Sequence, residues 1–277
     1  MKLIPVSALS SWTHCPSQFF VSYVLGVEEP PKGVMILGLI KHKLHELMSN
    51  GEEKIVTSLK ASGNLSEVLQ ASYIKLLRNI VTSHSNSLRA VNIPLVEAFQ
   101  KALPIVRFEA AERASRILPF LQQGLTGEGL WHALSPKVKT EFSVQSQKLG
   151  LKGRIDRLEC YEKAIVPVEL KSGNPPKDGV WDEHRIQAAS YALLLEDKFS
   201  TSVPEAVVQY VDHNSRRLVV MNPFLREHVV ETAAFVRECL ENQAVPKGCN
   251  RDGCSACLQL KDEIFVRNQL QKADRKL

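Results

Sequence analysis

An acidic residue and a lysine lie one position apart in a strand-like stretch near the middle of the chain. In AIVPVELKSG, Glu169 and Lys171 flank Leu170, and Asp156 precedes them in GRIDR. Because side chains alternate between the two faces of a strand, Glu169 and Lys171 share one face while Leu170 points into the core. If the strand with Asp156 pairs beside it, two carboxylates and the Leu170 backbone carbonyl form an oxygen-rich site that suits Mg²⁺ or Mn²⁺. This pattern predicts a divalent metal ion next to a lysine.

Hydrolysis of phosphodiester bonds is the chemistry that such a site would support. A bound divalent ion activates a water molecule and neutralises charge on the phosphoryl oxygens, while an ammonium group orients the water or stabilises the transition state. An acid two positions from a lysine is also common on the solvated face of an edge strand, and Asp156 with Arg157 would fit a surface ion pair. Both interpretations stay open on these residues alone.

The cysteines form a second group of residues that could bind a metal. The chain has six cysteines, and in a reducing cytoplasm metal ligation or simple burial explains them better than disulfides. Cys160 lies in a strand-like stretch and Cys239 in a helical one, so we interpret both as packing residues. Three of the others crowd into the loop GCNRDGCSAC, and one lies near the N-terminus. The candidate thiolates are Cys15, Cys249, Cys254 and Cys257.

The elements that must position these groups change along the chain. Helical spacing is found up to about residue 26 and again in GLIKHKLHELM, which contains His42. Residues 50–130 have further helical patterns interrupted by Pro94, Pro104 and Gly124, and we predict a helical insertion there. Residues 131–215 contain alternating β-branched stretches, typical of a small sheet, and within the same range the amphipathic helix DEHRIQAASYALLLED. A cysteine-rich loop at residues 245–260 closes the fold.

Composition sets broad limits on the fold and the partners. With 277 residues, of which 44% are hydrophobic, the chain can bury a sizeable core, enough for one large domain or two small ones. The order of helical and strand patterns favours a single α/β domain over residues 1–277. The net charge of +5 is compatible with a polyanionic partner but does not require one. We find no apolar run of about 18 residues and no apolar leader in MKLIPVSALSSW, so we expect a cytoplasmic protein without membrane contact.

Taken together, the motifs resemble the RecB-like branch of the PD-(D/E)XK nucleases over most of the chain. GLIKH resembles the family's Gly-x-x-x-His element, which implies that His42 is a metal ligand. QAASY resembles its Gln-x-x-x-Tyr helix, which implies that Gln187 and Tyr191 support the active site and contact DNA. GRIDR and VELKSG resemble its aspartate and Glu-x-Lys motifs. The catalytic set that this implies is Asp156, Glu169 and Lys171.

The resemblance also implies a fold and one further acidic residue. The fold would be a restriction-endonuclease-like mixed sheet flanked by helices, with the catalytic core at residues 131–215 and a cysteine-rich C-terminal cap. Glu141, in TEF just ahead of the predicted sheet, occupies the place of an acidic residue that is often found there.

Cluster-bearing members of this branch have one cysteine before the core and three after it, and this chain has the same layout. They include CRISPR-associated RecB-like exonucleases and the nuclease subunits of bacterial recombination helicases. The resemblance implies a 4Fe-4S cluster that pairs Cys15 with the C-terminal trio. The usual trio has its longer gap second, whereas here the longer gap comes first. Structural Zn²⁺ is therefore the alternative, because four-cysteine zinc sites tolerate such spacings, and His14 would be a further ligand.

The function implied is that of a metal-dependent DNA nuclease, either a single-strand exonuclease or a DNA-end-processing enzyme in repair, recombination or CRISPR adaptation. A helicase or an integrase would be its partner. Trp181, Tyr191 and Phe142 are available for stacking on bases. Two other hypotheses remain. The chain could be a catalytically silent or partner-dependent DNA-binding module, or a zinc or redox protein whose acids have no catalytic role.

Overall fold

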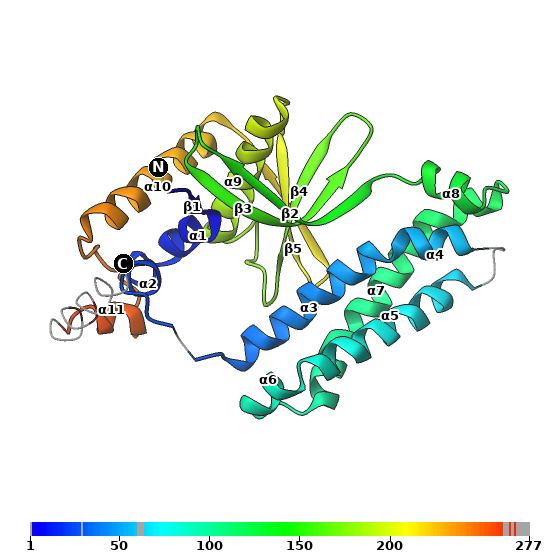
Figure 1. Cartoon of the computed structure of the whole chain (residues 1–277), viewed down its shortest axis with the longest axis horizontal. Coiled ribbons are helices and arrows are strands. Elements are labelled where there is room, and N and C mark those ends of the chain that lie inside the picture. Colours follow the sequence, from blue (N-terminus) through cyan, green and yellow to red (C-terminus); the bar gives the residue numbers. More distant parts are fainter. Residues whose placement is uncertain (1, 29, 60–63, 263–265, 267–268, 270–277) are drawn as a thin grey trace.

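Six strands form one mixed sheet, and helices cover both of its faces (Figure 1). The computed structural model describes residues 2–28, 30–59, 64–262, 266 and 269. The strand order is β1-β3-β4-β5-β6, and β2 pairs with β3 outside this path. Neighbours β1/β3 and β4/β5 are parallel, and the other pairs are antiparallel. The strands are β1 (Ile4–Pro5), β2 (Lys137–Ser146), β3 (Leu151–Cys160), β4 (Ile165–Lys171), β5 (Glu205–Tyr210) and β6 (Ser215–Val220).

The connection between β4 and β5 positions the residues that matter for chemistry. Parallel neighbouring strands need a crossover, and helix α9 (Asp182–Phe199) provides it. Strand β4 is rich in valine and isoleucine, which favours a strand buried on both faces. The end of β4, with Glu169 and Lys171, lies beside the first turns of α9, where Gln187 contacts both residues.

Two hydrophobic cores form on opposite faces of the sheet. Alternate residues of β5 belong to different cores: Val208 packs into the first and Val207 into the second, as the alternation of side chains along a strand requires. The helical segments that contribute to the first core are α1 (Val6–His14), α2 (Pro16–Phe19), the π-helix η1 (Phe20–Val24), α9, α10 (Pro223–Asn242) and α11 (Ser255–Gln259). Those of the second are α3 (Gly33–Asn50), α4 (Glu52–Ser58), α5 (Leu65–Ser83), α6 (Ser85–Ala90), α7 (Leu95–Gln122) and α8 (Gly127–Ala133).

Helix α7 differs from what the sequence predicts. It runs without interruption through Pro104 and Pro119, and Pro94 is its N-cap. A proline inside a helix costs roughly 3 kcal/mol, but α7 buries a long apolar face against α5, including Ile105 and Val106. The burial of several such side chains, at about 1.5–3 kcal/mol each, outweighs that cost.

A buried group of charged residues also ties the helices of the second core together. Arg113 on α7 is 2% exposed, and its guanidinium lies 2.9 Å from a Glu52 carboxylate oxygen and 3.3 Å from one of Glu109. Its Nη1 also donates to the backbone oxygen of Met48 at the end of α3 (3.2 Å). Because a buried charge is tolerated only when it is paired, these bonds fix α3 relative to α4 and α7.

The predicted fold class, a mixed α/β sheet flanked by helices, is confirmed. The described helices between residues 52 and 133 occupy the region predicted as a helical insertion, of which positions 60–63 lie outside the described residues. The first predicted helix is broken at Cys15, where the chain becomes extended (φ −161°), and beyond it α2 continues directly into the π-helix η1. Among the described residues, no helix has the length and apolar character needed to cross a bilayer.

Candidate active site and cysteine site

The predicted catalytic residues lie at a gap in the sheet along one edge of β3. On this edge β3 pairs with β1 at Leu151 and Lys152 and with β4 from Arg157 to Cys160. Residues 153–156 lie between these two ladders and have no strand partner there in the described part of the chain. Asp156 is the last residue of this gap, and Glu169 would be its partner if the ladder with β4 continued. The strands therefore separate where the two carboxylates lie.

Neighbouring side chains satisfy the backbone groups that the gap exposes. Asp156 Oδ2 accepts a hydrogen bond from the backbone N–H of Leu170 (2.8 Å), and the Tyr191 hydroxyl donates to the backbone oxygen of Arg154 (3.0 Å). Gly153 makes room for this tyrosine, because a Cβ there would lie 2.6 Å from Tyr191 Cε1. The gap is thus built into the fold, since buried backbone groups need such partners.

Glu169 is a buried carboxylate with one oxygen that lacks a partner. The residue is 4% exposed, and its Oε1 accepts hydrogen bonds from Gln187 Nε2 (2.6 Å) and Lys171 Nζ (2.9 Å). Its Oε2 is buried and has no hydrogen-bond partner among the described residues. Burial raises the pKa of Glu169 to about 7 despite the nearby lysine. An unpaired buried carboxylate oxygen is costly unless a cation or another donor reaches it.

Gln187 connects the remaining groups. Its side-chain oxygen accepts a bond from Lys171 Nζ (2.8 Å), while its nitrogen donates to Glu169 and lies 3.4 Å from the Tyr191 hydroxyl. Gln187 and Tyr191 lie one turn apart on α9 and so share a face. Tyr191 is 4% exposed, so its ring is not available to stack on a base, contrary to our expectation. Its observed contacts are those of a supporting residue.

His42 on α3 reaches the site from the other core. Its Nδ1 lies 3.5 Å from Asp156 Oδ1. Burial lowers the pKa of His42, but the hydrogen bond and charge of Asp156 outweigh it, so the pKa is raised. Burial would likewise raise the pKa of Asp156, but His42 and the Leu170 N–H overcome it, and this pKa is lowered. The pair therefore favours a charged carboxylate at Asp156.

Sequence reasoning missed the contacts that hold α3 against the end of β4. Lys41, next to His42, forms an ion pair with Asp212, whose other carboxylate oxygen accepts a bond from the backbone N–H of Gly173 (2.8 Å). Asp212 follows β5, and Gly173 lies two positions after Lys171. No motif marks Asp212 in the sequence, because its role depends on contacts between distant segments.

Glu141 lies in β2 between Thr140 and Phe142, which pair with Arg157 and Ile155, and it has a left-handed backbone (φ 51°). Such a conformation is uncommon for a non-glycine residue and is often found at functional sites. Its carboxylate forms an ion pair with Arg154 (2.7 Å). Burial raises the pKa of Glu141 although Arg154 opposes this. A third carboxylate thus lies near Asp156, on the opposite side of β3 from the gap.

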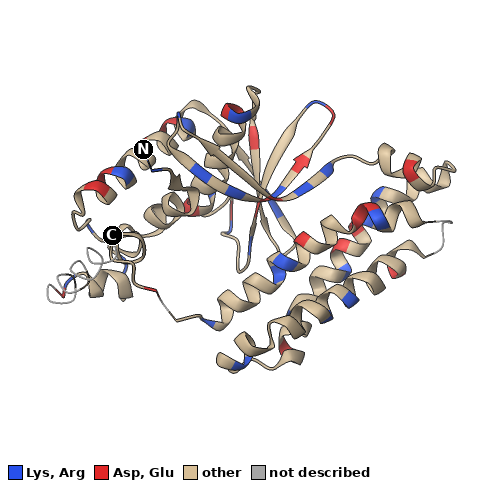
Figure 2. Cartoon of the chain, in the orientation of Figure 1, with Lys and Arg blue, Asp and Glu red and all other residues tan. Residues whose placement is uncertain are grey.

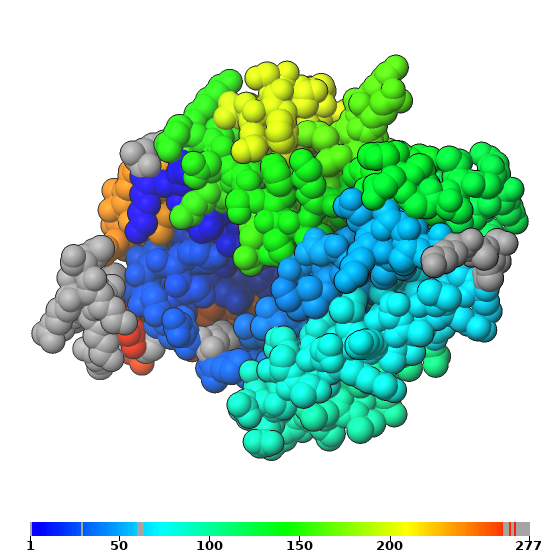
Figure 3. All heavy atoms as spheres, turned by 45° about the vertical axis from the view of Figure 1, so that its right-hand side comes forward, coloured from blue at the N-terminus to red at the C-terminus, as the bar shows by residue number. Residues whose placement is uncertain are grey.

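Two cavities meet at Asp156 and Arg154. One, of about 700 Å³, extends from Glu169 along α9 to Lys198; the other, of about 630 Å³, lies between α3, α5 and β2 and includes His42. Figure 3 shows the surface hollowed between the helices of the second core and the strands. Basic residues recur along β2 and β3 (Figure 2), and two of those in β3, Lys152 and Arg154, line the first cavity. The site is therefore open to an extended ligand from two sides.

The four predicted cysteines come together at a second site, at the junction of α1 and α2. Cys15 Sγ lies 3.8 Å from Cys254 Sγ and 3.7 Å from Cys257 Sγ, and Cys249 Sγ lies 3.7 Å from Cys257 Sγ. All four sulfurs lie within 4.8 Å of one another. Four soft thiolate donors suit a zinc ion or an iron–sulfur cluster. His14 is not in this group and instead lies 3.0 Å from Glu183.

The surroundings of the sulfurs differ in how far they favour the thiolate form. Arg251 donates from Nε to Cys249 Sγ (3.3 Å), and this bond lowers the pKa of Cys249 to about 6. Burial instead raises the pKa of Cys15 to about 12, so the charge of a bound metal is needed to remove that proton. Gly248 permits close packing, because a Cβ there would lie 2.8 Å from Cys257 Sγ. The site could thus bind a metal ion or an iron–sulfur cluster.

The fold and the two sites define a restriction-endonuclease-like α/β protein with an added cysteine site. The chain belongs to the PD-(D/E)XK nuclease superfamily, which matches residues 4–259. This confirms the family that the motifs predicted.

Three relatives illustrate the range of the family. A "CRISPR-associated exonuclease Cas4/endonuclease Cas1 fusion" of Myxococcus xanthus is 33% identical over 35% of this chain and 18% of its own length. The "DNA replication ATP-dependent helicase/nuclease dna2" of Schizosaccharomyces pombe is 22% identical over 98% of this chain and 19% of its own length. An ATP-dependent helicase/deoxyribonuclease polypeptide of Carboxydothermus hydrogenoformans is 23% identical over 71% of this chain and 18% of its own length. This chain therefore spans less than a fifth of each of these relatives.

Proposed function

We propose that this protein is a metal-dependent deoxyribonuclease that hydrolyses phosphodiester bonds in single-stranded DNA or at DNA ends. Membership of the nuclease superfamily supports the reaction class, and the names of two of the relatives support DNA as the substrate. The observation that carries the proposal is the unpaired Oε2 of Glu169, buried in a gap next to Asp156 and Lys171. A divalent cation would supply the partner that this oxygen lacks.

We assign the metal ligands to the imidazole of His42, the carboxylates of Asp156 and Glu169 and the backbone carbonyl of Leu170. These hard oxygen donors with one nitrogen suit Mg²⁺ or Mn²⁺. When bound, the ion would neutralise charge on the phosphoryl oxygens and activate the attacking water. The bonds from Gln187 and Lys171 to Glu169 Oε1 leave the second oxygen of this carboxylate for the ion.

Lys171 would act directly on the reacting groups. Its ammonium has three donors, of which two are used by Glu169 Oε1 and Gln187 Oε1. The third can hold the attacking water or a phosphate oxygen as negative charge develops, which is the role of a preorganised cation. Gln187 fixes the direction of this donor and Tyr191 supports Gln187, so both are positioning residues.

We further propose that the protein acts with a helicase or an integrase. The three relatives named above combine the matching segment with helicase or endonuclease functions in their names. Repair, recombination and CRISPR adaptation are the processes in which DNA ends of this kind are trimmed.

The four cysteines would hold a 4Fe-4S cluster, in keeping with the family branch that the layout resembles. A single Zn²⁺ ion is the second candidate, and one observation favours it. Tetrahedral bonds of about 2.3 Å place the sulfurs roughly 3.8 Å apart, which is close to the observed 3.7 and 3.8 Å. Visible absorbance and metal content of protein purified without oxygen distinguish the two, because only the cluster is coloured.

The test of the nuclease is cleavage of end-labelled single- and double-stranded DNA with Mg²⁺ or Mn²⁺ by the wild type and Lys171→Ala. We expect the variant to lose activity by about 100-fold to 1,000-fold, the usual effect of removing one transition-state donor. Lys198→Ala is the matched control, because Lys198 lines the same cavity while its Nζ lies over the Phe142 ring. Circular dichroism checks that both variants fold.

Two results would contradict the proposal. One is wild-type cleavage by Lys171→Ala. The other is tight, salt-sensitive DNA binding by the wild type without cleavage under either metal, which would assign the chain to the silent DNA-binding modules.

A further inference from the structure

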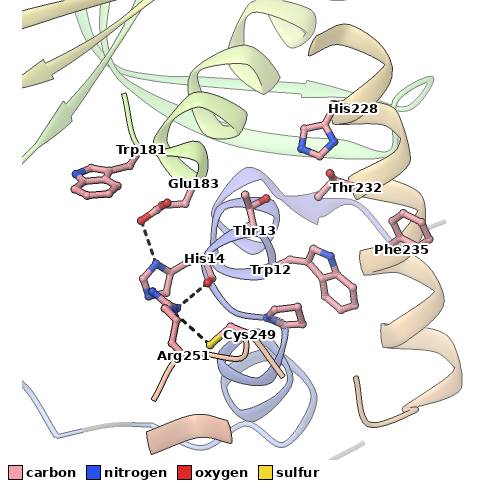
Figure 4. A pocket seen from close by; sticks show the side chains of 11 residues that line it. Trp12, Thr13, His14, Trp181, Glu183, His228, Thr232, Phe235, Cys249 and Arg251 are labelled. Carbon is pink, nitrogen blue, oxygen red and sulfur yellow. Dashed lines mark hydrogen bonds and ion pairs between the residues drawn. The ribbon is translucent and has the colours of Figure 1, made fainter. Parts of the chain in front are cut away.

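A third cavity, of about 740 Å³, lies outside the proposed active site, between α1, the start of α9, α10 and the cysteine loop (Figure 4). Its walls include three aromatic rings, those of Trp12, Trp181 and Phe235. Trp181 is 45% exposed and Phe235 is 55% exposed. Single exposed aromatic residues are ordinary, but several that line one concave surface indicate a binding site for a flat, apolar group.

The cavity also has polar and charged side chains, and those of His14, Glu183 and Arg251 lie on the side of Trp181 (Figure 4). Glu183 is held by His14, whose Nδ1 lies 3.0 Å from its Oε1. Arg251 donates to the backbone oxygen of His14 (2.7 Å) and to Cys249 Sγ. These bonds use two of its five N–H donors, so the described contacts leave donors for a ligand. The cavity therefore combines stacking surfaces with a cation and a carboxylate acceptor.

The cavity lies close to the proposed active site along one helix. Glu183 lines the cavity and Gln187 contacts the catalytic carboxylate, and both lie on α9 four residues apart. They share a face of the helix and are separated by about 6 Å along its axis. Trp181, the N-cap of α9, donates from its indole to the backbone oxygen of Asn174, in the segment that follows Lys171. A DNA strand bound at the carboxylates would thus need only a short length of chain to reach the cavity.

We propose that this cavity binds unpaired nucleotides of the DNA strand whose backbone lies at the active site. Trp181 and Phe235 lie at opposite ends of the cavity (Figure 4), so one base stacks on the exposed ring of Trp181 and a neighbouring base on that of Phe235. The Arg251 guanidinium contacts the adjoining phosphate. Glu183 can accept a hydrogen bond from an N–H group of the base, which every base offers. Stacking on aromatic rings does not depend on base identity, so the cavity would favour single strands over duplexes without reading sequence. This inference rests on the proposed function, because it assigns a subsite to the same substrate.

Tryptophan fluorescence provides a direct test. Trp12 and Trp181 line the cavity, whereas Trp131 lies on α8 and is replaced by phenylalanine. The protein, with its cysteine site loaded, carries Trp131→Phe and Lys171→Ala so that the DNA persists. We expect oligothymidylate to quench the fluorescence, whereas an oligomer of equal length with abasic sugars should not. Phe235→Ala in this background should weaken oligothymidylate binding about tenfold, the loss of one stacking contact.

Phe224→Ala is the matched control, because Phe224 lies on the same helix and is exposed but does not line the cavity. It should bind as tightly as the parent. Equal quenching by the abasic oligomer, or unchanged affinity of Phe235→Ala, would overturn the inference. So would quenching by a protein partner with none by DNA, which would assign the cavity to protein docking.

The two proposals fail separately. If the wild type cleaves DNA and the cavity does not respond to bases, the nuclease stands and the subsite is wrong. If the cavity responds to bases but the wild type cleaves nothing, the subsite stands as part of a binding module and the nuclease proposal is wrong.

Discussion

The two candidate sites of this protein are organised in opposite ways. At the carboxylate site, each carboxylate is held by several groups of the protein: Asp156 by a backbone N–H and Glu169 by Gln187 and Lys171. At the cysteine site, the four sulfurs lie within 4.8 Å of one another, and isolated donors such as Arg251 Nε reach single sulfurs. The first geometry is set by the fold, whereas the second brings together groups that would repel one another as thiolates unless a cation lay between them.

The elements that supply the ligands explain this difference. Asp156 and Glu169 lie on neighbouring strands in the middle of the sheet, fixed by ladders on either side. Cys249 precedes α11 in a segment without regular structure, and Cys257 lies on that helix of five residues. Arg251 adds one contact from this segment to α1. Removing the bound group should therefore change activity at the first site and stability at the second.

The largest expected effect on stability comes from Cys257→Ala. Structural metal sites contribute roughly 10 kcal/mol or more to folding, and we expect the loss of one ligand to remove a large part of this. Thermal unfolding followed by circular dichroism should show a clearly lowered Tm. Cys160→Ala is the control, because Cys160 lies in β3 outside the sulfur group. Equal Tm values for the two variants would remove the distinction between the sites.

Glu169→Gln should have the opposite effect on stability while abolishing cleavage. Burial raises the pKa of Glu169 to about 7 from an ordinary 4.5, so the charged side chain destabilises the metal-free fold. This cost grows as the pH rises from 4.5 to 7 and is constant above. It amounts to about 3 kcal/mol at 1.36 kcal/mol per pKa unit. Urea unfolding of metal-free protein should thus show the variant to be more stable at pH 8 and nearly equal at pH 4.5.

The comparison for Glu169→Gln is Glu141→Gln, at a carboxylate that is less buried and paired with Arg154. Its stability should change little. A destabilised Glu169→Gln would mean that the fold does not carry an uncompensated buried charge at this position, and the argument for a cation there would weaken.

The two sites also differ in how much of their geometry could be predicted from the sequence. Local alternation places Glu169 and Lys171 on one face of a strand, and β4 has them there. The contact of His42 with Asp156 rests on packing of α3 against the sheet, so only the family motif suggested it. The inverted spacing of the cysteine trio did not prevent the sulfurs from meeting, because an irregular segment of the chain can bend to bring them together.

Other features depend wholly on tertiary contacts. The burial of Tyr191 follows from the gap beside Gly153, which no periodicity encodes. The passage of α7 through Pro104 depends on its packing against α5. Arg251 and Asp212 act through partners far away in the chain. The partners of such charged residues cannot be predicted from the neighbouring sequence, because the fold determines which residues lie close to them.

If the fold presets the carboxylate site, a residue that only orients its members should matter less than the members themselves. Gln187→Leu removes the hydrogen bonds to Glu169 and Lys171 and replaces the amide with an apolar side chain of similar size. We expect the cleavage rate at saturating DNA to fall about 10-fold to 100-fold, as for other residues that orient metal ligands. Ser190→Ala is the control on the same helix, since its hydroxyl donates to the backbone oxygen of Ile186 within α9. A loss as large as that of Lys171→Ala would place Gln187 among the reacting groups.

The smallest expected effect, that of Gly153→Ala, tests whether the fold itself holds open the gap at residues 153–156. Gly153→Ala places a Cβ 2.6 Å from Tyr191 Cε1, and the ring must shift away from the Arg154 carbonyl to which its hydroxyl donates. Such overpacking costs about 1–3 kcal/mol, and the displaced tyrosine should slow cleavage modestly. Gly129→Ala on α8 should instead be neutral or stabilising by up to about 1 kcal/mol, because its nearest neighbour would lie 3.8 Å away. Equal stability of the two variants would show that the sheet around residues 153–156 can relax, so that the carboxylates there would depend on the ion for their positions, as the thiolates do.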